Sequence, residues 1–133
     1  MAGGRTGRPS IYNQNLAEEI CDSLSSGKSL RKICLSDTMP GQTTIFRWLH
    51  ENEEFRKQYT QARTHQADTL FDECLDIADD RLEEQTSPYA VARARLRIDT
   101  RKWMSGKLNP KKYGEKSEDN DSPDRSFTFG WRG

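Results

Sequence analysis

The hydrophobic residues of the first fifty positions recur three and four residues apart, which is the spacing of one face of an amphipathic helix. This spacing predicts three short helices, over about residues 14–26, 29–35 and 42–50. Gly27 ends the first helix, and a turn over residues 36–41 separates the second helix from the third. The N-terminal part is therefore predicted to be a three-helix unit with a sharp turn before its last helix.

Each of these helices has an apolar side. Asn15 with Glu18 resembles a capping box at the start of the first helix, and Ser29 caps the second. The residues predicted to form the shared core are Leu16, Ile20, Leu24, Leu30, Ile33, Cys34, Ile45, Trp48 and Leu49.

Two longer helices are predicted to follow. The first begins at Glu51 or Asn52 and runs to about Asp80, and the second covers about residues 90–107 after a loop over 81–89. An apolar stripe runs along each helix, so the two are expected to pack together as a hairpin. The residues predicted to drive oligomerisation through this hairpin are Leu70, Phe71, Cys74, Ile77, Val91, Ile98 and Trp103.

The composition narrows the class of protein. Hydrophobic residues make up 32% of the chain and charged residues another 32%, which favours short helices that complete their packing against partners. No apolar run approaches the roughly 20 residues of a membrane helix, and the first ten residues lack the apolar centre of a signal peptide. Cys21, Cys34 and Cys74 are far apart and are expected to be reduced core residues.

No motif indicates catalysis. The phosphate-binding loop of P-loop ATPases is absent. Asp79 with Asp80, and Glu83 with Glu84, could in principle hold two metal ions, but no basic or histidine partner accompanies them, so a solvated surface is favoured. The chain is therefore predicted not to be an enzyme, with no cofactor and no metal.

Charge is unevenly distributed although the net charge is zero. Residues 52–80 hold eight acidic and three basic residues, whereas residues 81–113 hold nine basic and three acidic residues. Two charged stripes at four-residue spacing result, formed by Asp68, Asp72, Asp76 and Asp80 and by Arg93, Arg97 and Arg101. The stripes could pair within the hairpin or between subunits, or remain solvated faces, and the arginines could instead contact DNA phosphates.

The three-helix unit has the pattern of a helix-turn-helix, in which the third helix lies in the major groove of DNA. Its first turns carry exposed polar residues that have no packing role, and Arg and Gln can read guanine and adenine edges. The arm before it, with Arg beside Gly and Pro, suits the minor groove. The candidate DNA contacts are Arg5, Arg8, Lys28, Arg31, Lys32, Gln42, Thr43, Thr44 and Arg47.

The predicted fold class is all-α: a trihelical helix-turn-helix domain, then a long helical hairpin for oligomerisation, and a short C-terminal β-strand. The predicted divisions are a flexible basic arm over 1–10, the DNA-binding domain over 11–51, the oligomerisation domain over 52–113, and an acidic tail over 114–133. Residues 126–131, SFTFGW, are the segment expected to form the strand.

Several motifs extend the argument: GRPS at 7–10, SSGKSL at 25–30, TIFRWL at 44–49, FRKQY at 55–59, RLRIDTRKW at 95–103 and NPKKYG at 109–114. Through them the chain resembles the small terminase subunit of tailed bacteriophages over about residues 7–114. The resemblance implies a subunit that recognises viral double-stranded DNA, assembles as a homo-oligomeric ring and delivers the DNA to the large terminase subunit. It also implies a place in the cytoplasm of the infected bacterium and not in the mature virion.

Other functions fit parts of the sequence. A transcriptional repressor with a helical dimerisation domain would share the helix-turn-helix, and it would be a dimer on a palindromic site. The arm and third helix also resemble the DNA-binding end of serine recombinases, but that function needs a catalytic domain. A plain trihelical bundle that binds no DNA would show the same apolar stripes.

Overall fold

A computed structural model describes residues 8–80 and 87–115. Over these residues the chain forms α1 (Gln14–Ser25), α2 (Leu30–Ile33), α3 (Gln42–Glu51), α4 (Glu53–Asp79), α5 (Pro88–Leu108) and α6 (Pro110–Tyr113). All regular structure in this part is helical, which confirms the predicted all-α class there. The predicted strand over 126–131, and Arg5 of the predicted arm, lie outside the described residues.

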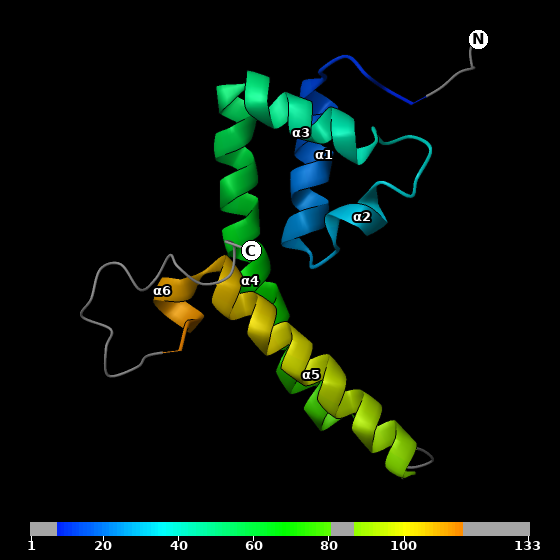
Figure 1. Ribbon diagram of the computed structural model, residues 1–133, viewed down its shortest axis with the longest axis vertical. Helices are drawn as coiled ribbons and strands as arrows, with labels where there is room; N and C mark the ends of the chain where they lie inside the picture. Colours follow the sequence, from blue (N-terminus) through cyan, green and yellow to red (C-terminus); the bar gives the residue numbers. More distant parts are fainter. Residues whose placement is uncertain (1–7, 81–86, 116–133) are drawn as a thin grey trace.

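The long helix α4 organises the molecule. Helices α1, α2 and α3 gather around its first half, and α5 runs back along its second half, so that α4 and α5 form a projecting hairpin (Figure 1). The short α6 turns away after α5 (Figure 1). One helix therefore belongs to both the three-helix unit and the hairpin.

The start of α1 differs from its predicted cap. The N-cap is Asn13, whose side-chain oxygen accepts hydrogen bonds from the backbone N–H groups of Asn15 and Leu16. Glu18 does not reach back to a cap and accepts a hydrogen bond from the Gln14 side chain instead. The predicted cap at Asn15 is therefore wrong by two residues. Asn13 and Asn15 both suit an N-cap, and residue type alone does not determine which one adopts the extended backbone.

The predicted stop at Gly27 is confirmed. Gly27 has a φ of 107°, in the left-handed region that a glycine adopts without a steric cost. Two hydrogen bonds then hold the turn against α4: Gln66 Nε2 donates to the Lys28 carbonyl at 3.0 Å, and Thr69 Oγ1 donates to the Ser25 carbonyl at 2.6 Å. The turn between α1 and α2 is thus fixed to the middle of the long helix.

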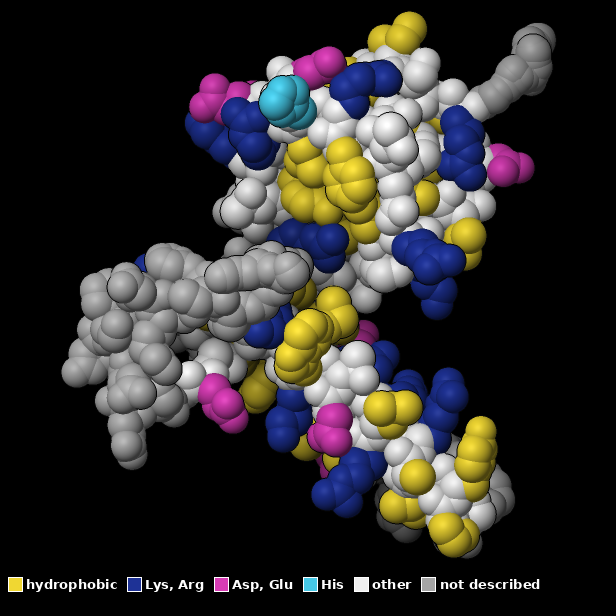
Figure 2. Space-filling model, in the orientation of Figure 1, with side chains coloured by type: hydrophobic (Ala, Val, Ile, Leu, Met, Phe, Trp, Pro, Cys, Tyr) yellow, Lys and Arg dark blue, Asp and Glu magenta, His cyan; other side chains and the backbone are white. Residues whose placement is uncertain are grey.

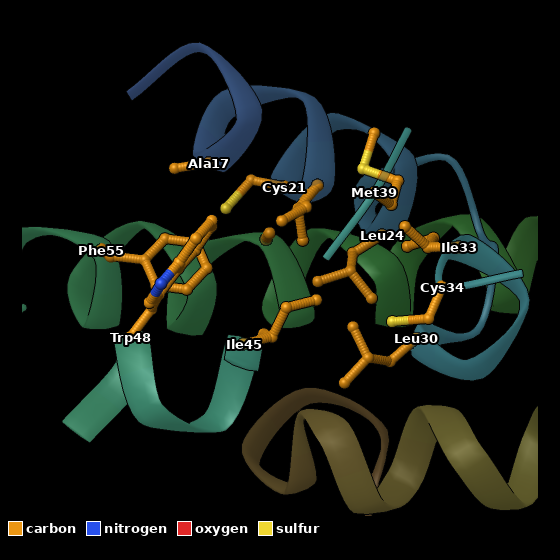
Figure 3. Packing of buried hydrophobic residues seen from close by; sticks show 12 residues of the cluster. Ala17, Cys21, Leu24, Leu30, Ile33, Cys34, Met39, Ile45, Trp48 and Phe55 are labelled. Atoms are coloured by element: carbon orange, nitrogen blue, oxygen red, sulfur yellow. The ribbon is translucent and has the colours of Figure 1, made fainter. Parts of the chain in front are cut away.

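The core of the three-helix unit extends into α4. The predicted core residues Leu24, Ile45 and Trp48 are joined by Phe55 of α4 (Figure 3). These four side chains and that of Ile20 are buried. Ala62, about two helical turns after Phe55 on α4, belongs to the same cluster. The first half of α4 therefore completes the core, so the core crosses the division that we predict between residues 51 and 52.

The cysteines of this core behave as small apolar side chains. Cys21 and Cys34 are buried and free. Burial, followed by the nearby charge of Asp22, raises the pKa of the Cys21 thiol to about 11. The thiol therefore stays protonated at neutral pH, which suits packing better than reactivity.

The helix α5 begins earlier than predicted. The sequence predicts a loop at Pro88, but Pro88 is the first residue of the helix. The Ser87 side chain caps the helix by accepting a hydrogen bond from the Ala90 N–H. Proline is favoured at this position because its missing N–H has no partner in the first turn of a helix. Ser87 and Pro88 together therefore form the start of α5.

Polar contacts hold the hairpin together as well as apolar ones. The buried Ser105 Oγ donates to the Ala67 carbonyl at 3.0 Å, and the Cys74 thiol lies 3.7 Å from the Ile98 carbonyl. Arg101 of the basic stripe pairs with Glu73 at 2.8 Å. Pairing of the arginine stripe with the aspartate stripe within the hairpin was one of the alternatives left open by the sequence. Arg101 instead pairs with Glu73, which lies outside the aspartate stripe.

The α6 segment is tied back to α4 through one carboxylate. The Tyr113 hydroxyl donates to Asp68 Oδ1 at 2.6 Å, and Lys112 Nζ lies 3.2 Å from the same oxygen. The Tyr113 ring also stacks on Phe71 with centroids 4.5 Å apart. The hydrogen bond from Tyr113 lowers the pKa of Asp68 below its ordinary value, and Lys112 adds to that effect.

Candidate nucleic-acid interface and assembly surface

The outward face of α3 is built by helical spacing. Ile45 and Trp48 are buried against the core, so the residues on the opposite side, Thr43, Arg47 and His50, are exposed. Gln42 is also exposed, at the first position of the helix. Thr44, by contrast, is only half-exposed, because it lies toward the buried side.

Arg47 connects this face to the chain segment before α1. Its Nη2 donates to the Ser10 carbonyl at 2.6 Å, and its Nε lies 4.0 Å from Glu51 Oε1 one turn later. Its side chain is nevertheless 48% exposed. The guanidinium is therefore positioned at the surface while part of it remains accessible to solvent.

Arg8 binds the turn between α2 and α3. Its Nη1 donates to the Cys34 carbonyl and to the Met39 carbonyl, both at 3.1 Å. These carbonyls lie near the two ends of the turn that precedes α3. DNA contact by Arg8 stays a prediction, and the structure gives this side chain an internal role that the sequence did not indicate.

Replacing Arg8 with alanine is expected to destabilise the fold by about 1–2 kcal/mol, because two charge-assisted hydrogen bonds to the turn are lost at a partly exposed site. Urea unfolding followed by circular dichroism measures this change. Arg31→Ala is the matched control, since Arg31 is exposed on α2. An Arg8→Ala protein as stable as this control would contradict the internal role.

The remaining basic candidates surround α2. Lys28 precedes the helix, and Arg31 and Lys32 lie in its last turn; all three are exposed. Their helix packs on α1 and shares with α3 the core that includes Leu30 and Ile45. The structure therefore places these cations on the surface of the unit that presents α3.

Two residues of the α3 face were not among the predicted contacts. Phe46 is 54% exposed and His50 is exposed, and both lie on the same side as Thr43. Helical spacing in the sequence could have identified both residues, because Phe46 and His50 follow Thr43 by three and seven positions and so share its face.

The predicted oligomerisation residues divide into two groups. Leu70 is buried within the protomer, and Cys74, Ile77 and Ile98 are half-buried. Three are exposed: Phe71 at 47%, although the Tyr113 ring stacks on it, Val91 at 59% and Trp103 at 63%. The first group therefore serves the hairpin itself, and assembly through the second group stays a prediction.

A further apolar row lies on the outer side of α5. Tyr89, Leu96 and Trp103 are 78%, 61% and 63% exposed, and they are spaced seven residues apart. Seven residues are close to two helical turns, so the three share one face, opposite the side on which Ser105 contacts α4. We call this row the hairpin stripe; hydrophobic side chains exposed among basic ones are visible along the hairpin (Figure 2).

The described residues contain no group of three or more histidine, cysteine or acidic side chains placed to hold a metal ion. Within the same ranges no helix is long and apolar enough to cross a membrane.

Comparison with known proteins shows which family the chain resembles. Residues 12–120 match the family described as bacteriophage Sf6, terminase small subunit-like. Crystal structures of the terminase small subunit gp1 of the bacterial virus Sf6, each with one substitution, are 45% to 46% identical to this chain. The matches cover 82% of each chain with TM-scores of 0.72 and 0.73.

A shorter match is to the uncharacterized protein YffO of Escherichia coli, at 40% identity over 53 residues. The matched segment is 40% of this chain and 38% of YffO. The family match, by contrast, covers both the three-helix unit and the hairpin. The chain belongs to the bacteriophage Sf6 terminase small subunit-like family, a non-catalytic family, and this membership implies a role in phage DNA packaging.

Proposed function

We propose that this protein recognises double-stranded viral DNA through α3, assembles as a ring through its helical hairpin, and delivers the DNA to the large terminase subunit. It acts in the cytoplasm of the infected host and leaves before the virion matures. The observation that carries the proposal is the exposed polar face of α3, in a chain of the small-subunit family.

The chemistry of the α3 face supports base reading. A guanidinium donates two parallel hydrogen bonds to guanine, and threonine and glutamine offer further donors and acceptors. Arg47 and Thr43 lie one turn apart, so both can enter the same groove. The α3 cap residue, Gly41, supplies no side-chain hydrogen bond, which leaves the start of the helix unobstructed for a close approach to the DNA backbone.

The hairpin supports assembly. Exposed tyrosine, leucine and tryptophan side chains at seven-residue spacing form the pattern of a helix that packs against another helix. A monomer would leave this apolar area in water, at a cost of about 25 cal/mol for each Å². A second copy of the chain is the partner that the family resemblance favours.

A dimeric repressor remains the alternative. It would use the same α3 face but would pair two α3 helices across a palindromic site. The family match favours the packaging subunit, and the number of subunits in solution separates the two functions.

Replacing Arg47 with alanine is expected to weaken binding to a preferred duplex by about 10- to 100-fold and to flatten the sequence preference, because a bidentate base contact is lost. The test is fluorescence anisotropy of the full chain on a duplex recovered by selection from a random-core library, at fixed salt. Arg47→Lys should keep part of the affinity but little of the preference, because an ammonium lacks the two-donor fork.

The matched control is Arg95→Ala, which removes an exposed arginine from α5, away from α3. It should bind almost as wild type does. Unfolding curves of both variants separate a lost contact from a lost fold, since Arg47 also contacts the Ser10 carbonyl. Equal binding by wild type and Arg47→Ala would exclude α3 as the reading helix.

A further inference from the structure

Phe46 is an apolar side chain on a polar surface. It is 54% exposed, although it is one of the largest side chains of the three-helix unit. The aromatic contacts of that unit join Tyr12, Trp48, Phe55 and Tyr59, and in the described part of the chain none of them includes Phe46. The ring is therefore not needed for the core.

Phe46 lies on one side of the outward face of α3, beside Thr43 and His50, which are opposite the buried Ile45. Thr43 lies three residues before it, Arg47 follows it, and His50 lies four residues after it. Thr43 and His50 are therefore neighbours of Phe46 on the helix surface, whereas Arg47 lies about 100° around the helix from it. The buried residues of the same helix, Ile45 and Trp48, face the other way. DNA that covers the face between these two sides, at Thr43 and His50, would therefore lie within reach of both Arg47 and Phe46.

Base edges in the major groove are polar with one exception. Guanine, cytosine and adenine present hydrogen-bonding groups there, and thymine alone adds an apolar group, its 5-methyl. A phenyl ring forms no hydrogen bonds with the polar groups of a base edge. Packing the ring on those groups would remove them from water without a compensating hydrogen bond, which costs free energy. Contact with a methyl group, in contrast, removes apolar surface of both partners from water.

We propose that Phe46 is a specificity-determining residue that selects a thymine by packing on its 5-methyl group. The proposal rests on the proposed function, because it needs α3 to lie in the major groove. It predicts that the preferred DNA site contains a thymine next to the base that Arg47 reads.

The test replaces thymine with deoxyuridine, which lacks only the methyl group and pairs identically. A preferred duplex is first recovered with the full wild-type chain from a random-core library. Each thymine is then changed to deoxyuridine in turn, and binding is measured by fluorescence anisotropy. One replacement should weaken wild-type binding by about three- to tenfold, the size expected for one buried methyl group.

Phe46→Ala should bind the thymine duplex about as weakly as wild type binds the deoxyuridine duplex, and it should not distinguish the two. Phe46→Leu is the matched variant, because leucine keeps an apolar contact; it should retain most of the discrimination. Thermal unfolding of both variants should resemble that of wild type, since Phe46 lies outside the core.

Three results would overturn the proposal. They are a preferred site without thymine, wild-type binding that ignores every deoxyuridine replacement, and a Phe46→Ala protein that still discriminates as strongly as wild type. Each leaves the proposed function standing, because sequence-selective binding through Arg47 is measured separately. Absence of any sequence preference in the wild-type chain would instead contradict the proposed function.

Discussion

Replacing Trp48 with alanine is expected to destabilise the three-helix unit by about 3–5 kcal/mol, the cost of deleting a large buried aromatic side chain. Trp48 is 2% exposed and lies between two other rings, with centroids 5.2 Å from Tyr12 and 6.2 Å from Phe55. It is also the residue that fixes α3 to the start of α4 (Figure 3). Because small domains have about 5–15 kcal/mol of stability, this loss removes much of the total.

Urea unfolding monitored by circular dichroism measures the effect. Trp48→Phe is the informative control. The indole Nε1 is buried without a hydrogen-bond partner, so phenylalanine removes an unsatisfied donor while it retains a ring. Its cost should be well below that of alanine. If the alanine variant lost less than about 1 kcal/mol, the packing of α3 on α4 described above would be wrong.

Placing aspartates on the hairpin stripe is expected to dissociate the proposed assembly into monomers of 15.3 kDa. The double variant Leu96→Asp with Trp103→Asp puts two charges into a contact that we propose to be apolar, and burying an unpaired charge is strongly unfavourable. Neither side chain faces α4 within the protomer, so the variant should still fold. Light scattering coupled to size exclusion gives the mass, and circular dichroism gives the helix content.

Lys102→Asp is the control for this variant. Lys102 is exposed on the same helix but lies outside the hairpin stripe, so its replacement adds negative charge without blocking the contact. It should assemble as wild type does. A double variant that keeps the wild-type mass would show that copies of this chain do not meet through the stripe.

Helical periodicity predicted the helices because one face of each is buried. The third helix, predicted over 42–50, corresponds to α3 with one added residue. Starts were less predictable, since Asn13 and Asn15 suit a cap equally and Pro88 fits both a loop and a first helical turn. These choices depend on backbone conformation, which residue type alone does not determine.

The candidate site was predictable on α3 and less so elsewhere. Spacing placed Thr43 and Arg47 on one exposed face, which the structure shows. Nothing in the sequence indicates that Arg8 reaches the Cys34 and Met39 carbonyls, because that contact joins positions far apart in the chain.

The hairpin poses a different problem for sequence reasoning. Leu70 and Trp103 both belong to apolar stripes, yet one is buried within the protomer and the other is exposed. An apolar stripe marks a contact surface without saying whether the partner is the same chain or another copy. Only the packed structure of the hairpin distinguishes the residues buried within the protomer from those left exposed.

The most direct test of the proposed ring is the mass of the full wild-type chain in solution, by light scattering coupled to size exclusion at two salt concentrations. We expect a mass well above that of a tetramer of 15.3 kDa chains. The mass should persist at high salt, because the hairpin stripe is apolar and salt screens only charges. A dimer, or a monomer, would contradict the packaging ring, and a dimer would favour the repressor.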